Sequence, residues 1–190
     1  RDALTSSRLV TLCGPGGVGK TRLATTVAAG LGGAWLVELA SVTEPADVAM
    51  AVAQALGAFE IESPTPGHST RFDGPTETIE RLAATLGDQP ALLVLDNCEH
   101  VIAAAAELAE ELLGRCPELR IAATSREPLA ITGETVCPIG PLSREAAVRL
   151  FTERAAAAGA GAGPGLDASM VAEVCDRLDG LPLAIELAAA

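Results

Sequence analysis

A glycine-rich segment has the spacing G-x-x-x-x-G-K-[ST], which is typical of a phosphate-binding loop. It consists of Gly14, Pro15, Gly16, Gly17, Val18, Gly19, Lys20 and Thr21. Glycines let backbone N–H groups surround a phosphate, because larger side chains would block its approach. Lys20 would bring a positive charge to the β- and γ-phosphates, and Thr21 would offer its hydroxyl to Mg²⁺. The segment therefore predicts a P-loop that binds the phosphates of a nucleotide.

An acidic residue, Asp96, ends the apolar run Leu92 to Leu95. In a parallel sheet the carboxyl ends of the strands face the nucleotide, so Asp96 is placed to hold Mg²⁺ through water. The predicted metal ligands are therefore Thr21 and Asp96, and Mg²⁺ is expected together with the nucleotide; the resemblance described below implies that this nucleotide is ATP or ADP.

The residues after Asp96 do not decide which group would activate the attacking water. Many P-loop ATPases place a second acid directly after this aspartate, but here Asn97 occupies that place. Glu99 is a candidate general base, although it equally fits an acid that favours a helix N-terminus. His100 is a further candidate base, and a structural role is the alternative for it.

A second strand-like run, Ile121 to Ser125, ends beside Arg126. At the nucleotide-facing edge of a parallel sheet, this cation can sense the γ-phosphate, and Thr124 or Ser125 can hydrogen-bond it. A surface arginine at a strand end is the alternative. The predicted catalytic set is Asp96, Glu99 and Arg126.

The elements that must position these residues alternate between strand and helix up to about residue 140. Strands are expected at 9–12, 34–39, 91–95, 119–124 and 135–139, and helices at 20–31, 45–56, 76–86 and 99–113. The predicted fold class is α/β, with a three-layer parallel sheet of the P-loop NTPase type (RecA- or AAA-like) over residues 1–140. A long polar loop, expected to be mobile, covers 58–75.

After Pro141 the pattern predicts helices alone, so we expect a partial helical domain over 141–190. Ser143 can cap a helix that runs to about 158, and Asp167 can cap another that runs to 178. Between them, residues 159–165 are rich in Ala, Gly and Pro and predict a flexible connection. The segment Gly180 to Ala184 predicts a corner between two helices.

Composition excludes several classes of function. The chain has 190 residues, of which 49% are hydrophobic, and its 13 Lys and Arg against 25 Asp and Glu give a net charge of −12. This acidity argues against direct nucleic-acid contact by this fragment, and it gives no support to docking on an anionic membrane. The five cysteines contain no C-x-x-C pair, which favours reduced thiols in a cytoplasmic protein. The chain lacks an initiator Met and stops within an expected helix, so we expect a piece of a larger protein.

Together these motifs resemble the NB-ARC/STAND class of signal-transduction ATPases, and most of all the ATPase modules of bacterial SARP- and LuxR-type transcriptional regulators. Four segments carry the resemblance, in the expected order and over nearly the whole chain: Gly14–Thr21, Leu92–His100, Thr124–Leu129 and Gly180–Ala184. The resemblance implies that Arg126 is the first sensor of phosphate state and that Pro182 lies against the nucleotide base. Two family features are absent: the Val-Gly-Arg-Glu-like segment before the P-loop, and the histidine of a winged-helix part beyond Ala190.

The resemblance implies a molecular switch with slow, regulatory ATPase activity. ADP would hold a closed form, and ATP exchange would open it for self-association or for release of an effector domain, so the partners are other domains of the parent regulator. A small-molecule P-loop kinase is an alternative, but it would need a lid with arginines, and residues 58–75 carry only Arg71. A scaffold that binds nucleotide without turnover is a third possibility, which Asn97 keeps open. The predicted nucleotide-binding set is Gly14, Pro15, Gly16, Gly17, Val18, Gly19, Lys20, Thr21, Arg22 and Pro182.

Overall fold

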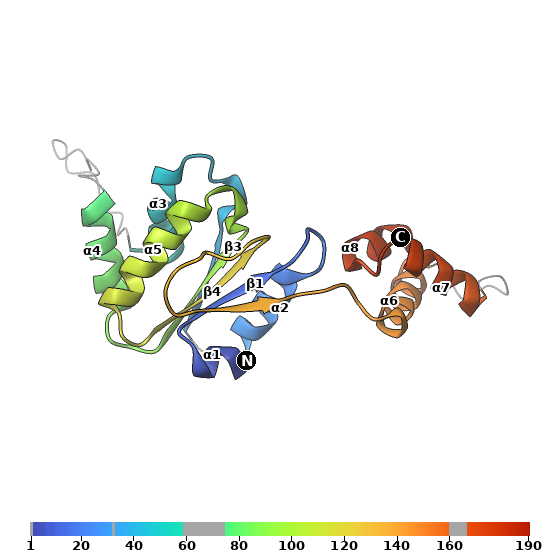
Figure 1. Ribbon diagram of the computed structural model, residues 1–190. Helices are drawn as coiled ribbons and strands as arrows, with labels where there is room; N and C mark the ends of the chain where they lie inside the picture. The colour runs from blue at the N-terminus through green and yellow to red at the C-terminus, as the bar shows by residue number, and fades with distance from the viewer. Residues whose placement is uncertain (1, 32, 59–74, 160–166) are drawn as a thin grey trace. The chain divides into compact units, whose positions relative to one another are not determined.

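The computed structural model describes residues 2–31, 33–58, 75–159 and 167–190, which fall into two compact units (Figure 1). The sheet unit comprises the chain up to Cys13 together with Thr21–Cys137, and the helical unit comprises Gly14–Lys20 together with Pro138–Ala190. Most of the loop expected at 58–75, with Arg71, lies outside the described residues. So does most of the connection expected at 159–165.

A five-stranded sheet forms the centre of the sheet unit, in the order β2-β3-β4-β1-β5. The strands are β1 (Leu9–Cys13), β2 (Ala34–Glu38), β3 (Ala91–Asp96), β4 (Leu119–Ser125) and β5 (Glu134–Pro138). The neighbours β1 and β4, β4 and β3, and β3 and β2 all run parallel. The sequence-based prediction of a parallel α/β sheet is thus confirmed, and β4 lies between the two strands that carry the P-loop and Asp96.

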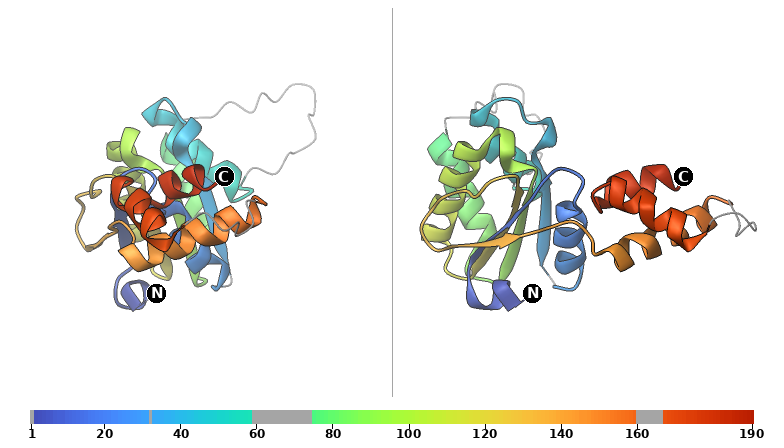
Figure 2. Two further views of the ribbon diagram at one scale, coloured as in Figure 1. Left: turned by 90° about the vertical axis from the view of Figure 1, so that its right-hand side faces the viewer. Right: turned by 45° about the vertical axis from the view of Figure 1, so that its right-hand side comes forward.

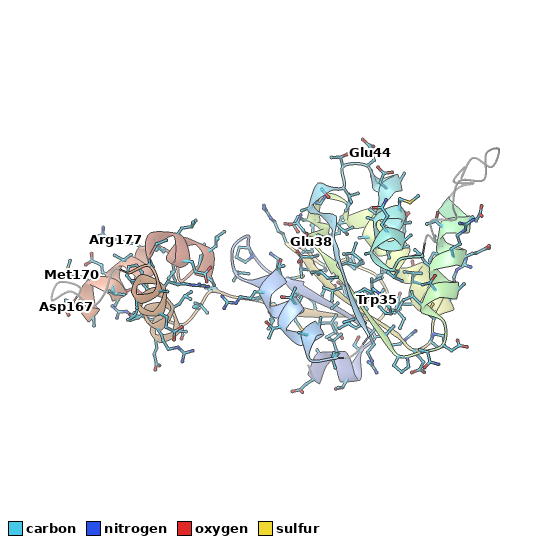
Figure 3. The ribbon with its side chains drawn as sticks, turned by 180° about the vertical axis from the view of Figure 1, so that it is seen from behind. Trp35, Glu38, Glu44, Asp167, Met170 and Arg177 are labelled. Atoms are coloured by element: carbon cyan, nitrogen blue, oxygen red, sulfur yellow. The ribbon has the colours of Figure 1, made fainter. Side chains whose placement is uncertain are left out.

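The central strands are continuous apolar runs because they are buried. Every residue of β3 is buried, and in β4 only Arg120 is not fully covered. A parallel strand covered on both faces has no solvent side, so it shows no polar alternation. The edge strand β2, where Figure 3 labels Trp35 and Glu38, is instead mostly half-buried or exposed.

Helices cover both faces of this sheet, as Figures 1 and 2 show. Leu93 and Leu95 point into one apolar core with α3 (Val48–Ala55), α4 (Pro75–Leu86) and α5 (Ile102–Arg115). Leu92 and Val94 point to the opposite face and pack with α1 (Asp2–Ser6) and α2 (Lys20–Ala29). The expected three layers are therefore present. Among the described residues, no helix is long and apolar enough to cross a membrane.

Three short elements differ from the predicted ones. Helix α1 was not among the expected helices. The helix expected at 45–56 is divided into a 3-10 turn, Pro45–Asp47, and α3. The helix expected at 99–113 begins only at Ile102, because the 3-10 turn Cys98–His100 follows a residue with left-handed backbone, Asn97. Local geometry after β3 thus shifts the start of α5 away from Glu99.

The helical unit contains α6 (Arg144–Ala157), α7 (Ala168–Arg177) and α8 (Pro182–Ala188). Both predicted caps are present: the Ser143 hydroxyl accepts the Ala146 N–H at 3.3 Å, and the Asp167 carboxylate accepts the Ser169 N–H at 3.2 Å. Figure 3 labels Asp167 and Arg177 at the two ends of α7. The core between these helices consists of Ala147, Phe151, Ala155, Val171, Cys175, Ile185 and Ala189.

The corner between α7 and α8 depends on Gly180. Its φ of 64° lies in the left-handed region, and a Cβ there would stand 2.7 Å from the Leu142 carbonyl oxygen. The Leu142 N–H also donates to the Gly180 carbonyl at 2.9 Å, which draws the two backbones together. Only glycine fits such a close approach in this backbone conformation. The corner expected at Gly180–Ala184 is therefore a tight packing device of the helical unit.

We expect Gly180→Ala to destabilise the helical unit more than Gly159→Ala. Both glycines have positive φ, so alanine at either position costs about 1–2 kcal/mol of backbone strain. Only at Gly180 does the new methyl group also meet a carbonyl, because a Cβ at Gly159 meets no described atom within 4 Å. Urea unfolding of the two variants, followed by circular dichroism, measures the difference. An equal loss of unfolding free energy in both variants would contradict the role given to the close approach of Gly180 to the Leu142 carbonyl.

Candidate nucleotide-binding site

The carboxyl ends of β1, β4 and β3 meet at one edge of the sheet. Cys13, the last residue of β1, is in register with Ser125, and Leu95 is in register with Ala123. The P-loop, Arg126 and Asn97 are the continuations of these three strands. Ligands of parallel α/β sheets bind at such an edge, outside the carboxyl ends of the strands.

The backbone of the P-loop requires glycine at several positions. Gly17 and Gly19 have φ values of 77° and 95°, which side-chain-bearing residues rarely adopt. At Gly14 the reason is space, because a Cβ would stand 2.4 Å from the Ile139 carbonyl oxygen. The glycines inferred from the motif are thus needed for the conformation of the loop as well as for phosphate access.

Lys20 lies folded into the P-loop, with only 8% of its surface exposed. Its Nζ donates to the carbonyl oxygens of Gly14 at 2.8 Å and Pro15 at 3.1 Å. Carbonyl dipoles solvate the ammonium without cancelling its charge, so the loop keeps a positive potential. At the start of α2 the helix dipole adds to it, which suits an anionic ligand.

The carboxylate of Asp96 joins three elements of the sheet unit. Thr21 Oγ1, in the first turn of α2, donates to both carboxylate oxygens at 2.8 and 3.0 Å. Thr124 Oγ1, at the end of β4, donates to Asp96 Oδ1 at 2.6 Å and accepts the Asn97 N–H at 2.9 Å. Asp96 and Thr124 are both buried. The predicted pair Thr21 and Asp96 is therefore brought together, and Thr124 is a partner that the sequence did not reveal.

This donor set fits Mg²⁺ shared with a phosphate. A hydroxyl oxygen and one carboxylate are hard ligands, and Mg²⁺ is usually held by one or two carboxylates with phosphates and water. Within the described part of the chain, no group of three or more His, Cys, Asp and Glu side chains gathers to hold a metal. Thr21 and Asp96 are the residues that would hold the ion, which when bound would neutralise phosphate charge.

Asn97 and His100 shape the turn that follows β3. Asn97 has a φ of 65°, which asparagine tolerates better than most residues. His100 Nε2 lies 3.0 Å from the Leu39 carbonyl and 2.9 Å from the Val42 carbonyl, and these two acceptors assign the ring proton to Nε2. Its Nδ1 then accepts from the Asn97 side-chain amide at 3.4 Å. Both ring nitrogens are engaged, which agrees with the structural alternative for His100.

Glu99 and Arg126 form an ion pair across the ends of β3 and β4. Arg126 Nε donates to Glu99 Oε1 at 3.1 Å. The glutamate side chain is only 19% exposed, whereas the arginine side chain is 67% exposed. The second oxygen, Oε2, is buried and has no hydrogen-bond partner among the described residues. Sequence spacing placed both residues near the site but did not predict that they would bind each other.

Cys98 lies between these acids and is fully buried. Burial, assisted by the Asp96 and Glu99 carboxylates, raises the pKa of the Cys98 thiol to about 12. The thiol therefore stays protonated near neutral pH and is not a nucleophile. Cys98 is therefore a small core residue of the sheet unit.

The remaining predicted contacts lie on two helices. Arg22 is exposed in the first turn of α2. Pro182 is half-buried at the first position of α8, and the N–H of the next residue, Leu183, donates to the Gly17 carbonyl at 3.2 Å. A Cβ on Gly17 would stand 3.1 Å from Leu183 Cβ. Within the helical unit, α8 thus packs directly on the P-loop.

A protein-family model described as an AAA domain matches residues 3–134. This match covers more than half of the chain. The chain belongs to the AAA domain family. The fold of this family generally binds nucleotide with Mg²⁺, and the P-loop and Asp96 of this AAA domain lie inside the matched residues.

Curated relatives of this AAA domain come from mycobacteria. A Mycobacterium tuberculosis protein provisionally named an HTH-type transcriptional regulator is 45% identical over 199 residues. The match covers 100% of this chain but 21% of the relative, so the chain spans about a fifth of that protein's length. An uncharacterized protein of the same species is 40% identical, with coverage of 100% of this chain and 47% of that protein.

Solved structures share the fold at low sequence identity. A STAND protein with a tetratricopeptide repeat sensor from Pyrococcus horikoshii matches with a TM-score of 0.64 and 16% identity, over 97% of this chain and 28% of the other. Cdc6p from Pyrobaculum aerophilum matches with a TM-score of 0.58 and 18% identity, over 95% of this chain and 53% of the other. These similarities confirm the P-loop, AAA-like fold class.

We expect Thr124→Val to lower the free energy of unfolding by about 1–3 kcal/mol, because it leaves a buried carboxylate oxygen and the Asn97 N–H without their shared partner. Valine has nearly the shape of threonine, so little packing is lost. Thr124→Ser keeps the hydroxyl and should retain most of the stability. Urea denaturation of the nucleotide-free chain measures both. A valine variant as stable as wild type would show that this network contributes nothing.

Proposed function

We propose that this AAA domain is a nucleotide-controlled switch that binds ATP or ADP with Mg²⁺ and changes conformation with the state of the nucleotide. The observation that best supports a switch is the contact of α8 with the phosphate-binding loop, through the Leu183 N–H and the Gly17 carbonyl. A ligand that reshapes the loop acts directly on this contact. A nucleotide can shift the populations of two arrangements of this contact only if it binds one arrangement more tightly than the other.

The proposed roles follow from charge and position. Lys20 and the backbone N–H groups of the P-loop neutralise phosphates, while Thr21 and Asp96 hold Mg²⁺. Arg126 senses the γ-phosphate from the end of β4, and Pro182 lies against the base. Arg22, in the exposed first turn of α2, supports nucleotide binding beside the loop.

Turnover is proposed to be slow. Glu99 is the candidate base that would accept a proton from an attacking water, but Arg126 already occupies one of its oxygens. Asn97 directly follows Asp96 and carries no ionisable group. These two observations also favour the alternative of a scaffold that binds nucleotide without hydrolysing it.

The relatives support a place in a larger regulator. The chain spans about a fifth of the protein named as an HTH-type transcriptional regulator, which leaves room for other domains in that relative. The Pyrococcus neighbour, titled a signal transduction ATPase with numerous domains, supports the NB-ARC/STAND assignment at the level of fold. We infer a cytoplasmic SARP- or LuxR-type regulator whose nucleotide state controls self-association and contacts with its other domains.

We expect Lys20→Ala to weaken ATP and ADP binding by more than about 100-fold, since it removes the buried cation that faces the phosphates. Isothermal titration calorimetry on the 190-residue chain measures both affinities. Arg81→Ala, which removes an exposed cation on α4, is the matched control and should bind as wild type does. Unchanged affinity in the Lys20 variant would exclude the P-loop as the binding site.

We expect Asp96→Asn to remove most of the Mg²⁺ dependence of ATP binding. Asparagine keeps the size of the side chain but lacks the negative charge that a divalent cation needs. The measured quantity is the ratio of ATP affinities with Mg²⁺ and with a chelator, which should fall towards one. Asp47→Asn, an exposed substitution ahead of α3, should leave the ratio unchanged. A wild-type ratio in the Asp96 variant would assign the ion to other ligands.

A further inference from the structure

The two side chains of the ion pair between Glu99 and Arg126 differ in their exposure to solvent. Glu99 is largely covered, and one of its oxygens is buried with no partner in the part of the chain that the structure describes, so the carboxylate depends on Arg126 for its charge-assisted hydrogen bond. Arg126 is mostly exposed, so its long side chain has room to move. The arginine can therefore leave this contact much more easily than the glutamate can follow it.

Arg126 lies at the carboxyl edge of the sheet, where Asp96 ends the neighbouring strand β3. It follows Ser125, whose register partner Cys13 is the last residue before the P-loop. Glu99 lies close behind Asp96 in the turn after β3. The pair thus joins the sensor proposed for the γ-phosphate to the base proposed for hydrolysis.

A phosphate group competes well for this guanidinium. Arginine presents several N–H donors in a planar fork, which matches two oxygens of a phosphate, whereas the hydrogen bond to Glu99 is made through Nε. A γ-phosphate also carries more negative charge than one carboxylate. A diphosphate has no γ-phosphate and so offers no such competitor.

We propose that Arg126 holds the Glu99 carboxylate until the γ-phosphate of a bound triphosphate takes the guanidinium, so that sensing ATP and releasing the base are one event. This inference rests on the proposed nucleotide-binding function. It assigns Arg126 a positioning role towards Glu99 in addition to its role as a sensor.

The competition has a measurable consequence in binding. If Glu99 and the γ-phosphate share one arginine, weakening the Glu99 contact must favour ATP, because linkage is reciprocal. Glu99→Gln removes the charge of the carboxylate but keeps its shape. We expect it to raise the affinity for a non-hydrolysable ATP analogue about two- to fivefold, the range of a mostly exposed ion pair, and to leave ADP affinity unchanged.

The experiment is a binding cycle on the 190-residue chain. Calorimetry with Mg²⁺ gives the affinity ratio of the ATP analogue to ADP for wild type, Glu99→Gln, Arg126→Ala and the double variant. We expect Glu99→Gln to raise the ratio, Arg126→Ala to lower it, and Glu99→Gln to have no effect once Arg126 is absent. The pair Glu77 and Arg81 on α4, at 2.7 Å, is the control, and Glu77→Gln should leave the ratio unchanged.

A second cycle uses the nucleotide-free protein. Unfolding of the same variants in urea should give non-additive losses for Glu99→Gln and Arg126→Ala, since the residues are in contact. Additive losses would overturn the inference without reference to nucleotide binding. If wild type binds nucleotide but Glu99→Gln leaves the ratio unchanged, the inference fails and the proposed switch stands. If wild type binds neither nucleotide, the proposed function fails and the competition with it.

Discussion

The hydrogen bonds around the Asp96 carboxylate are the interaction on which the site depends. A buried carboxylate is costly unless polar partners surround it, and here Thr21 and Thr124 provide hydroxyl donors from α2 and from β4. The strand order makes this possible, because β4 lies between β1 and β3 and so places Thr124 beside Asp96. The network holds the first turn of α2 next to the end of β3, and under the proposed function Thr21 and Asp96 would share a Mg²⁺ ion there.

The positive charges discussed for the candidate site of this AAA domain come from single residues of an acidic chain. The net charge of −12 gives no general attraction for phosphate, yet the Lys20 side chain lies inside the P-loop, where it donates to a backbone carbonyl. At the next strand end, Arg126 is paired with Glu99. Under the proposed function, a nucleotide would meet one cation that is fixed by burial and one that must give up a carboxylate. In that proposal, this difference would separate the binding of a nucleotide from the sensing of its third phosphate.

The P-loop is connected to one unit along the chain and packs within the other. Along the chain it joins β1 to α2 of the sheet unit, while its contacts group Gly14–Lys20 with the helical unit, where α8 and the segment around Ile139 pack on its glycines. Gly14 and Gly17 thus serve packing as well as phosphate access. Under the proposed function, this double membership is how a ligand on a short loop would act on an entire helical unit, and in a longer regulator on the domains attached to it.

The sequence by itself determined the local features of this protein. Residue spacing identified the P-loop, the apolar runs predicted the parallel strands, and Ser143 and Asp167 predicted where two helices begin, because caps and periodicity depend on neighbours along the chain. It did not predict the role of Thr124, the pairing of Glu99 with Arg126, the carbonyl contacts of His100, or the contact of α8 with Gly17. Each of these joins residues far apart in the chain, and the strand order and the packing of helices bring them together. Only the tertiary structure decided them, since no local pattern encodes which strand ends become neighbours.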